Sequence, residues 1–415
     1  MLFRFSLYGF LKNQRYFEPF LILVFLEKGL SFFLIGLLIA FREVTVNVFE
    51  IPSGAIADVW GRRKSMILSF AAYIASFLVF GLARNIALLF VAMFLFAIGE
   101  AFRTGTHKAM IFTWLRLQGR ADERTKVYGY TRSWSKYGSA LSAVLAALFV
   151  YISDSYTYVF YFTIVPYALG IVNFLGYPDE LDGATEGGTP FSQIIYRLKE
   201  SFKEAFGRAG LRRLIAESMG FQGVYGATKD YLQPVLKGAA VVLAGRWVAT
   251  EAMSEIQQTT CVIGPTCLVL YLLAGVASRQ AHRIATLAGD EERAARLLWG
   301  GNALIFAVLA SVAFHRIDLA LIVTFVLLDV LQNFWRPVQL GRFVIRGSEE
   351  QGATLLSIES QGRRGATVIA APLLGLAVDT VTARGIGGPF WPVGILGTAV
   401  ALVFFLTASG KSRDL

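Results

Sequence analysis

The chain has 415 residues, of which 55% are hydrophobic and only 16% charged, and its mean hydropathy is +0.56. A soluble protein of this length would need more charged residues to cover the surfaces of its domains, so this composition excludes a soluble globular protein. The formal net charge of +10 would suggest nucleic acid in a soluble domain. We expect no nucleic-acid partner here, because the basic residues gather at the ends of apolar segments.

Apolar segments follow one another along the whole chain, and a helix needs about 20 such residues to span a bilayer. Segments such as IALLFVAMFLFAIG (86–99) do not alternate as the strands of a membrane barrel would. We therefore predict an all-α polytopic membrane protein with twelve transmembrane helices. The predicted spans are residues 3–25, 31–57, 65–83, 86–114, 127–151, 156–177, 212–237, 252–277, 294–314, 317–340, 353–381 and 389–409.

The limits of the first span follow from an internal repeat, because hydropathy alone would extend a single helix over residues 16–41. RYFEPFL (15–21) is similar to DYLQPVL (230–236), and KYGSA (136–140) is similar to RRGAT (363–367). The two offsets are close to each other, which indicates two pseudo-symmetric halves. The first span then ends near residue 25. We expect no removable signal peptide, because no small-residue cleavage site follows a short apolar core in the first residues.

A polar segment joins the two halves and begins with the Pro, Gly and acidic residues typical of a loop. FSQIIYRLKESFKEAF (191–206) then has apolar residues at helical spacing, which predicts an amphipathic cytoplasmic helix. A partly ordered linker is the alternative. The predicted domains are an N-terminal six-helix bundle (1–177), a cytoplasmic linker (178–211) and a C-terminal six-helix bundle (212–415).

The segment GAIADVWGRR (54–63) lies between the second and third spans. Gly54 allows a close helix approach, and Asp58 can accept hydrogen bonds from a cation or from a helix N-terminus. Such a group can form in one conformation and break in another. The predicted conformational latch consists of Gly54, Asp58, Gly61, Arg62 and Arg63.

The Lys and Arg residues outside the spans lie mostly on one side of the predicted topology. The positive-inside rule places this side, with both termini, in the cytoplasm. We therefore expect a multi-pass protein of the plasma (inner) membrane whose surroundings are the lipid bilayer.

Charged residues also occur inside the predicted spans, where each costs about 2.5–3.5 kcal/mol at mid-span. They recur at helical spacing, so that each of several helices presents one polar stripe, as a central aqueous cavity requires. Glu100 with Arg103 and Glu359 with Arg363 can also be structural pairs, and His107 can be a packing residue. The predicted substrate-binding residues are Arg103, Arg132, Trp134, Lys136, Arg336 and Arg363, and the predicted coupling-ion residues are Glu43, Asp230, Asp329 and Glu359.

The latch segment resembles the signature of the major facilitator superfamily, G-x-x-x-D-x-x-G-R-[KR], in its residue types, spacing and position between the second and third helices. The resemblance implies two six-helix bundles around a central site, with alternating access controlled in part by Asp58, Arg62 and Arg63. The corresponding segment of the second half, AGVASRQAHR (274–283), has Arg279 where an acid is expected. The fifth span lacks the G-x-x-x-G-P-x-x-G-G pattern of many drug–proton antiporters.

These features predict a secondary active transporter, a monomer, for a small polar or anionic organic solute, because basic residues dominate the fourth and fifth spans. The expected coupling ion is a proton or sodium. The sequence contains no nucleotide-binding loop. Its three His and two Cys form no catalytic or metal-ligand motif. We therefore expect no cofactor, no metal and no enzyme activity. The alternatives are a proton-coupled multidrug efflux antiporter and a sensor or assembly protein on a transporter scaffold.

Overall fold

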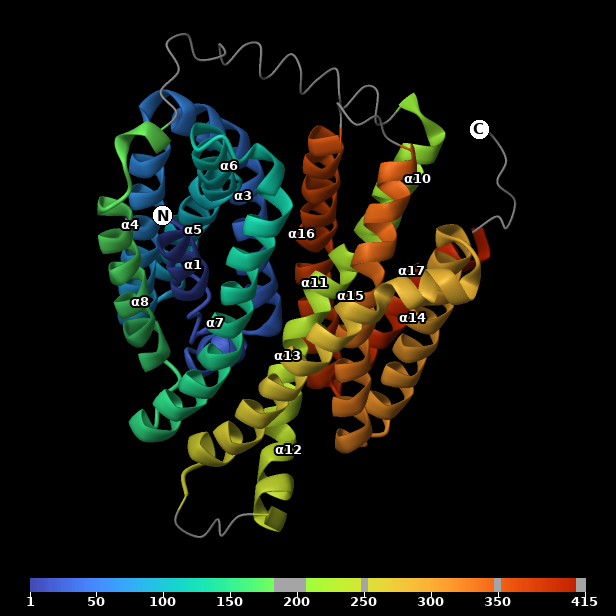
Figure 1. Ribbon diagram of the computed structural model, residues 1–415. Helices are drawn as coiled ribbons and strands as arrows, with labels where there is room; N and C mark the ends of the chain where they lie inside the picture. Colours follow the sequence, from blue (N-terminus) through green and yellow to red (C-terminus); the bar gives the residue numbers. More distant parts are fainter. Residues whose placement is uncertain (183–206, 248–252, 347–351, 408–415) are drawn as a thin grey trace. The chain divides into compact units, whose positions relative to one another are not determined.

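The computed structural model describes residues 1–182, 207–247, 253–346 and 352–407, which form helices and no strand (Figure 1). The predicted all-α class is confirmed. The predicted amphipathic helix at 191–206 lies outside the described residues.

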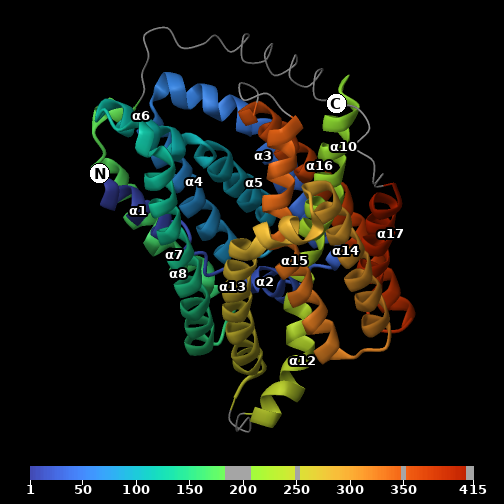
Figure 2. The same ribbon diagram turned by 45° about the vertical axis from the view of Figure 1, so that its right-hand side comes forward.

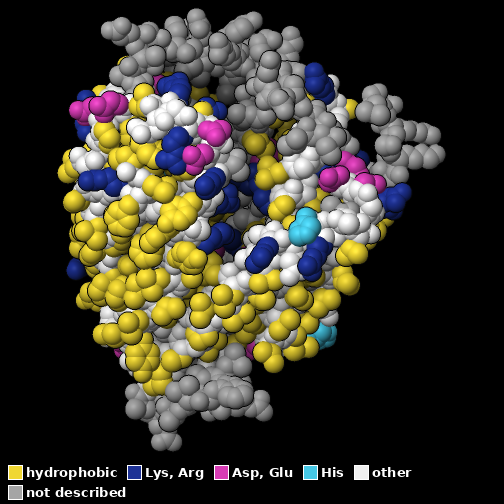
Figure 3. Space-filling model, viewed as in Figure 1, with side chains coloured by type: hydrophobic (Ala, Val, Ile, Leu, Met, Phe, Trp, Pro, Cys, Tyr) yellow, Lys and Arg dark blue, Asp and Glu magenta, His cyan; other side chains and the backbone are white. Residues whose placement is uncertain are grey.

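Many of the described helices are long and apolar enough to cross a membrane by length and composition. Hydrophobic side chains cover much of the face drawn in Figure 3, and several are strongly exposed, such as Leu82 at 67%. We attribute this exposure to contact with lipid, because exposing so much apolar surface to water would be energetically unfavourable. The nine candidate spans, consistent with the predicted topology, are Phe32–Trp60, Arg62–Leu82, Ile86–Leu117, Ala121–Ser153, Tyr158–Leu175, Glu255–Ala288, Glu291–Phe314, Asp318–Phe343 and Leu355–Arg384 within the described residues.

Contacts between Cα atoms divide the chain into two compact units. Unit 1 comprises Met1–Val24, Phe41–Ile195 and Ala249–Leu268, and unit 2 comprises Phe25–Ala40, Tyr196–Val248 and Val269–Leu415. Two long helices therefore contribute residues to both units. The division into domains at residues 177 and 212 stays a prediction.

Unit 1 is built around a column of aromatic side chains. Tyr73 packs edge-on against Phe96 and Tyr167, with ring centroids 5.1 Å apart in both pairs. Gly138 brings two helices together, because a Cβ there would lie 2.6 Å from the carbonyl oxygen of Phe10. The elements of unit 1 are α1 (Leu2–Leu11), η1 (Glu18–Phe20), part of α2 (Leu21–Glu27), part of α3 (Phe32–Trp60), α4 (Arg62–Leu82), α5 (Ile86–Arg103), α6 (Thr106–Leu117), η2 (Ala121–Glu123), α7 (Arg124–Ser153), α8 (Tyr158–Leu175), η3 (Asp179–Leu181) and the start of α13 (Glu255–Ala288).

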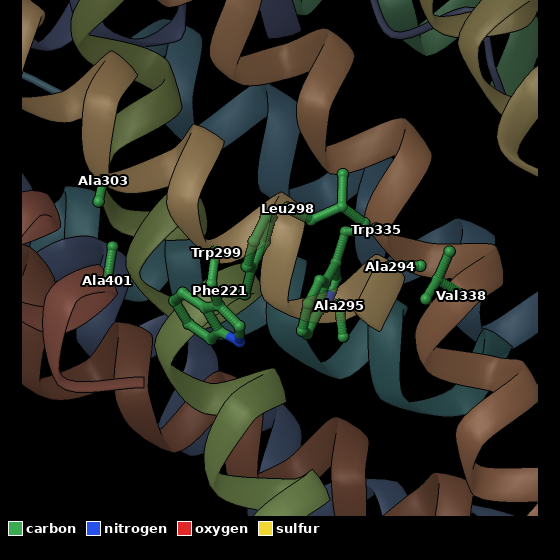
Figure 4. Close-up of a cluster of buried hydrophobic side chains, with 9 residues drawn as sticks. All are labelled: Phe221, Ala294, Ala295, Leu298, Trp299, Ala303, Trp335, Val338 and Ala401. Atoms are coloured by element: carbon green, nitrogen blue, oxygen red, sulfur yellow. The ribbon is translucent and has the colours of Figure 1, made fainter. Parts of the chain in front are cut away.

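Unit 2 has its own core, in which Phe221 stacks on Trp335 at 4.0 Å and meets Trp299 edge-on at 4.8 Å (Figure 4). Helices α14 and α17 pack side by side, as Figure 2 shows. The remaining elements of unit 2 are α10 (Ala209–Ser218), η4 (Met219–Gly223), α11 (Val224–Thr228), η5 (Lys229–Tyr231), α12 (Leu232–Trp247), α14 (Glu291–Phe314), α15 (Asp318–Arg346), α16 (Gly352–Arg384) and α17 (Trp391–Thr407).

Three predicted spans are not continuous α-helices. The first is divided into α1, η1 and α2, and Pro19 lies in the first turn of η1, where its missing N–H is tolerated. The fourth is interrupted after α5, where Gly105 has a φ of +80°. The seventh contains a π-helical turn at η4 and a 3-10 turn at η5. Such turns disrupt the regular hydrogen-bond ladder and often occur at functional sites.

Candidate functional site

Unit 1 contains a cavity of about 400 Å³ between α1, the junction of α5 with α6, and α7. This volume lies within the range of about 300–1,000 Å³ that small-molecule sites occupy. Three of the predicted substrate-binding residues, Arg103, Arg132 and Lys136, line it. Arg132 and Lys136 lie one turn apart on α7, which places both on the same helix face.

The wall of this cavity is basic. Besides Arg103, Arg132 and Lys136 it includes Lys12 from α1's C-cap and Lys108 from the first turn of α6, and no carboxylate of the described residues lines it. Lys12 and Lys108 are not among the site residues predicted from the sequence. Their position inside predicted membrane spans was the one sequence feature that could have suggested a role in the site. Only the packing of α1 and α6 against α7 shows that both line the same cavity.

Within the described part of the chain, Arg103 is the one cation of the wall that forms an ion pair with a carboxylate. It pairs with Glu100, which also lies 3.5 Å from Arg15 and accepts a hydrogen bond from the hydroxyl of Tyr73. The Nε of Arg103 donates to the same Tyr73 oxygen at 3.3 Å. The pair of Glu100 and Arg103 is therefore part of a network that ties α4 and α5 together, while Arg103 also lines the cavity.

Aromatic rings hold two of the lysines in place. The ammonium of Lys108 lies 5.4 Å from the ring centre of Phe112 and 5.5 Å from that of Tyr128. The ammonium of Lys12 lies 5.7 Å from the ring centre of Tyr8. Such cation–π contacts fix the position of a charge without neutralising it.

Two aromatic side chains near the basic residues have packing contacts, and one of them, His107, also lines the cavity. His107 is buried, stacks on Tyr8 at 3.7 Å and lies 3.2 Å from the hydroxyl of Tyr177, which is the contact pattern of a packing residue. Trp134 is not part of the lining, and its ring meets that of Phe10 edge-on at 6.4 Å. Trp134 therefore braces α7 against α1.

The start of α6 adds positive potential to the same cavity. Gly105 precedes this helix and lines the cavity, and no described side chain caps the helix there. The uncapped N–H groups of a helix N-terminus carry partial positive charge. Their placement inside the candidate span 86–117 resembles the broken helices whose ends face charged solutes in transporters.

The latch residues join the end of α3 to the start of α4. Arg62 pairs with Asp58 at 3.1 Å and donates to the hydroxyl of Thr113 at 3.0 Å. Gly61 has a φ of +108°, which favours glycine, and Gly54 has open space around it.

Arg63 holds the segment that follows α8. Its guanidinium pairs with Asp179 at 2.5 Å and donates to the carbonyl of Tyr177 at 2.9 Å, while its backbone N–H donates to Asp182 at 2.6 Å. The two predicted latch cations, Arg62 and Arg63, therefore contact different partners in this conformation.

In unit 2 the structure brings three predicted residues together. Glu359 is fully buried, pairs with Arg336 at 2.8 Å and lies 4.0 Å from Arg363. Both arginines also donate to the side-chain oxygen of Gln222, at 3.2 and 3.1 Å. Gln222 lies in the π-helical turn η4, so this irregular turn places its amide between two cations.

The other predicted coupling acids have different contact partners. Glu43 pairs with its neighbour Arg42 at 2.5 Å in unit 1, and Asp230 pairs with the adjacent lysine at 3.4 Å in unit 2. Asp329 accepts a hydrogen bond from the hydroxyl of Tyr225. Each of these three acids therefore has a contact of its own with a neighbouring basic or hydroxyl group.

Unit 2 also contains a buried ion pair that the spacing of charges along the sequence does not indicate. Arg342, 2% exposed, pairs with the equally buried Glu217 and with Glu292 at 2.7 Å. The carboxylate of Asp379 likewise went unnoticed; it accepts from the first backbone N–H groups of α3 at 3.0 and 2.8 Å. Both contacts join residues far apart in the chain, so spacing could not indicate them.

Three comparisons relate this chain to known proteins. The sequence model of a family described as Major Facilitator Superfamily matches residues 10–338. An uncharacterized MFS-type transporter of Bacillus subtilis (strain 168), YxaM, is 25% identical over 224 residues, which are 53% of this chain and 54% of that protein. The match thus spans about half the length of that relative.

Solved structures resemble the fold along almost the whole chain. The nucleoside transporter NupG superposes with a TM-score of 0.76 at 11% identity, covering 98% of both chains. A D-xylose-proton symporter gives a TM-score of 0.68 at 14% identity, covering 99% of both chains. A POT family transporter in complex with a thioalcohol conjugated peptide also gives 0.68 at 14% identity, covering 99% of this chain and 96% of that one. At these identities the likeness concerns the fold.

Proposed function

We propose that this chain, which belongs to the Major Facilitator Superfamily, is a secondary active transporter that carries a small anionic organic solute across the bacterial plasma membrane by alternating access. The observation that carries the proposal is the cavity in unit 1, whose wall, among the described residues, holds five Lys or Arg side chains and no carboxylate. A chain uses such costly charges inside a membrane span chiefly where they face a pathway or a partner.

The charge of the cavity argues against the multidrug alternative. A lipophilic cation would meet like charges in a hollow partly shielded from water, where electrostatic repulsion is stronger than in bulk solvent. The solved relatives are described as transporters of nucleosides, xylose and peptides. Because one fold carries solutes this diverse, the fold does not determine the solute of this chain, and the side chains of its cavity must do so.

For coupling we infer a proton, with Glu359 and Asp329 as the acids to test. Glu359 pairs with Arg336 at 2.8 Å and lies 4.0 Å from Arg363, so its protonation would weaken both contacts and change how α15 meets α16. Asp329 accepts from Tyr225, and protonation would remove the charge that this hydroxyl contacts. Sodium is the alternative coupling ion.

The test is uptake into proteoliposomes that contain the purified protein, with an imposed pH gradient and a panel of organic anions and lipophilic cations. We expect uptake of at least one anion and none of the cations. Uptake of lipophilic cations that is unaffected by Arg132→Gln would contradict the anion proposal. Specific binding with no transport in either direction would favour the sensor alternative.

A further inference from the structure

We propose that the cavity of unit 1 is selective for doubly charged organic anions, such as phosphate monoesters or dicarboxylates, over singly charged ones. The inference rests on the proposed function, because it names the solute class of the same site. Binding is nevertheless measurable without transport, so the two can fail separately.

The first step is the charge balance of the wall. Glu100 offsets the charge of Arg103, as described above. Among the described residues, no carboxylate forms an ion pair with any of the other four cations that line the cavity, which are Lys12, Lys108, Arg132 and Lys136. The hollow therefore carries at least three positive charges, those of Lys108, Arg132 and Lys136, with which no described acidic side chain forms an ion pair.

The second step is the effect of this imbalance on a ligand. A singly charged anion would leave most of the wall's positive charge uncompensated, and like charges gathered in a concave wall focus their potential into it. A second negative charge on the ligand gains further attraction from cations that are already in place. The second negative charge of a ligand therefore gains more electrostatic binding energy in this cavity than it would on an exposed surface.

The third step is that the donors are held in position before the ligand arrives. The rings of Tyr8, Phe112 and Tyr128 hold the two lysines, and Arg132 and Lys136 project from adjacent turns of one helix. The uncapped start of α6 contributes backbone N–H groups at the same wall. Donors that need little ordering lose little of their binding energy to entropy.

The experiment measures binding of matched anions to the detergent-solubilised full chain at pH 7.5 by isothermal titration calorimetry. Sulfate is compared with methyl sulfate, and succinate with monomethyl succinate, so that each pair differs chiefly by one charge. Methyl phosphate is the probe for a phosphoryl group. We expect at least one doubly charged probe to bind at least tenfold more tightly than the singly charged probes. Tighter binding of methyl phosphate would indicate a phosphate monoester as the solute, and tighter binding of succinate would indicate a dicarboxylate.

Variants show whether the preference belongs to this cavity. Lys108→Gln and Lys136→Gln should each reduce the preference for the doubly charged probe by at least threefold, and Lys136→Arg should retain it. The control is Arg116→Gln, which removes an exposed cation from the same helix as Lys108, away from the cavity. A size-exclusion profile checks that each variant is folded.

Equal binding of both members of each pair would overturn the proposal, as would an equal effect of Arg116→Gln. Selective binding without uptake in proteoliposomes would preserve this inference and contradict the proposed transport. Uptake of singly charged anions alone would preserve transport and contradict the inference.

Discussion

At the scale of single residues, ionic groups inside the helices divide into those that hold the fold and those that face a hollow. Arg342 and Glu217 belong to the first class, because both are buried and paired. Arg132 and Lys136 belong to the second, because they line the cavity without a described carboxylate partner. Residue type alone does not separate the classes; burial and partners do.

Removal of a buried cation should cost more stability than removal of its exposed partner. Arg342→Gln removes one of the two guanidinium groups that contact the buried carboxylate of Glu217, while Arg213 remains 2.8 Å from it. We therefore expect a loss near the lower end of the about 3–5 kcal/mol that breaking a buried ion pair typically costs. Glu292→Gln removes a partner that is 45% exposed, for which about 1 kcal/mol or less is typical. Thermal unfolding of both variants in detergent measures the difference. Equal losses would show that the pair with Glu217 is not the stabilising contact.

Removal of the charge of Glu359 should uncouple transport from the proton gradient. Glu359→Gln keeps the shape of the side chain but cannot exchange a proton, so we expect exchange of labelled for unlabelled solute to continue while uptake driven by a pH gradient is lost. The matched control is Glu180→Gln, an exposed acid in η3. Unchanged gradient-driven uptake by Glu359→Gln would remove Glu359 from the coupling mechanism.

At the scale of elements, local backbone exceptions position the functional residues. The break at Gly105 turns one apolar segment into α5 and α6 and brings the start of α6 to the cavity. The π-helical turn η4 places Gln222 between Arg336 and Arg363. Each exception interrupts a helix where polar side chains meet, which is the arrangement that broken transporter helices use.

Two glycines of the latch should respond to alanine in opposite ways. Gly61 has a positive φ, and a Cβ there would lie 3.1 Å from the carboxylate carbon of Asp182. We therefore expect Gly61→Ala to destabilise the protein by about 1–3 kcal/mol. Gly54 is helical, and a Cβ at this position would meet no described atom within 4 Å, so Gly54→Ala should be neutral or stabilising by up to about 1 kcal/mol.

Thermal unfolding measures the change in stability of both variants. Uptake into proteoliposomes measures whether Gly54→Ala also changes the rate of transport. If Gly54 makes a close helix approach in another state of the transport cycle, Gly54→Ala will slow uptake without lowering stability. Normal uptake by this variant would show that alternating access needs no such approach at Gly54.

At the scale of the whole molecule, the positive-inside rule predicts an orientation that the fold by itself does not test. With both termini in the cytoplasm, a green fluorescent protein fused to the C-terminus should fluoresce, and alkaline phosphatase fused there should be inactive. In a variant that carries Cys261→Ser and Cys267→Ser, the further substitution Arg120→Cys should give a thiol that reacts with an impermeant reagent only from the cytoplasmic side. Labelling from outside would reverse the predicted topology.

The sequence by itself determined the class and the family, and it indicated some of the residues that line the cavity. Continuous apolar segments leave only membrane-spanning helices as a solution, and the latch signature indicated the superfamily that the family comparison confirmed. Helical spacing also marked Arg132 and Lys136 as members of one stripe, because the helical period is a local property.

Tertiary structure alone decided which polar stripes share a hollow and which charges compensate one another. It placed Lys12 and Lys108 in the cavity with Arg132, excluded Trp134 from its wall, and joined Arg342 to Glu217. The physical reason is distance along the chain: ion pairs and cavity walls join residues on different helices. Their meeting depends on how helices pack and where glycines interrupt them, which a local pattern does not encode.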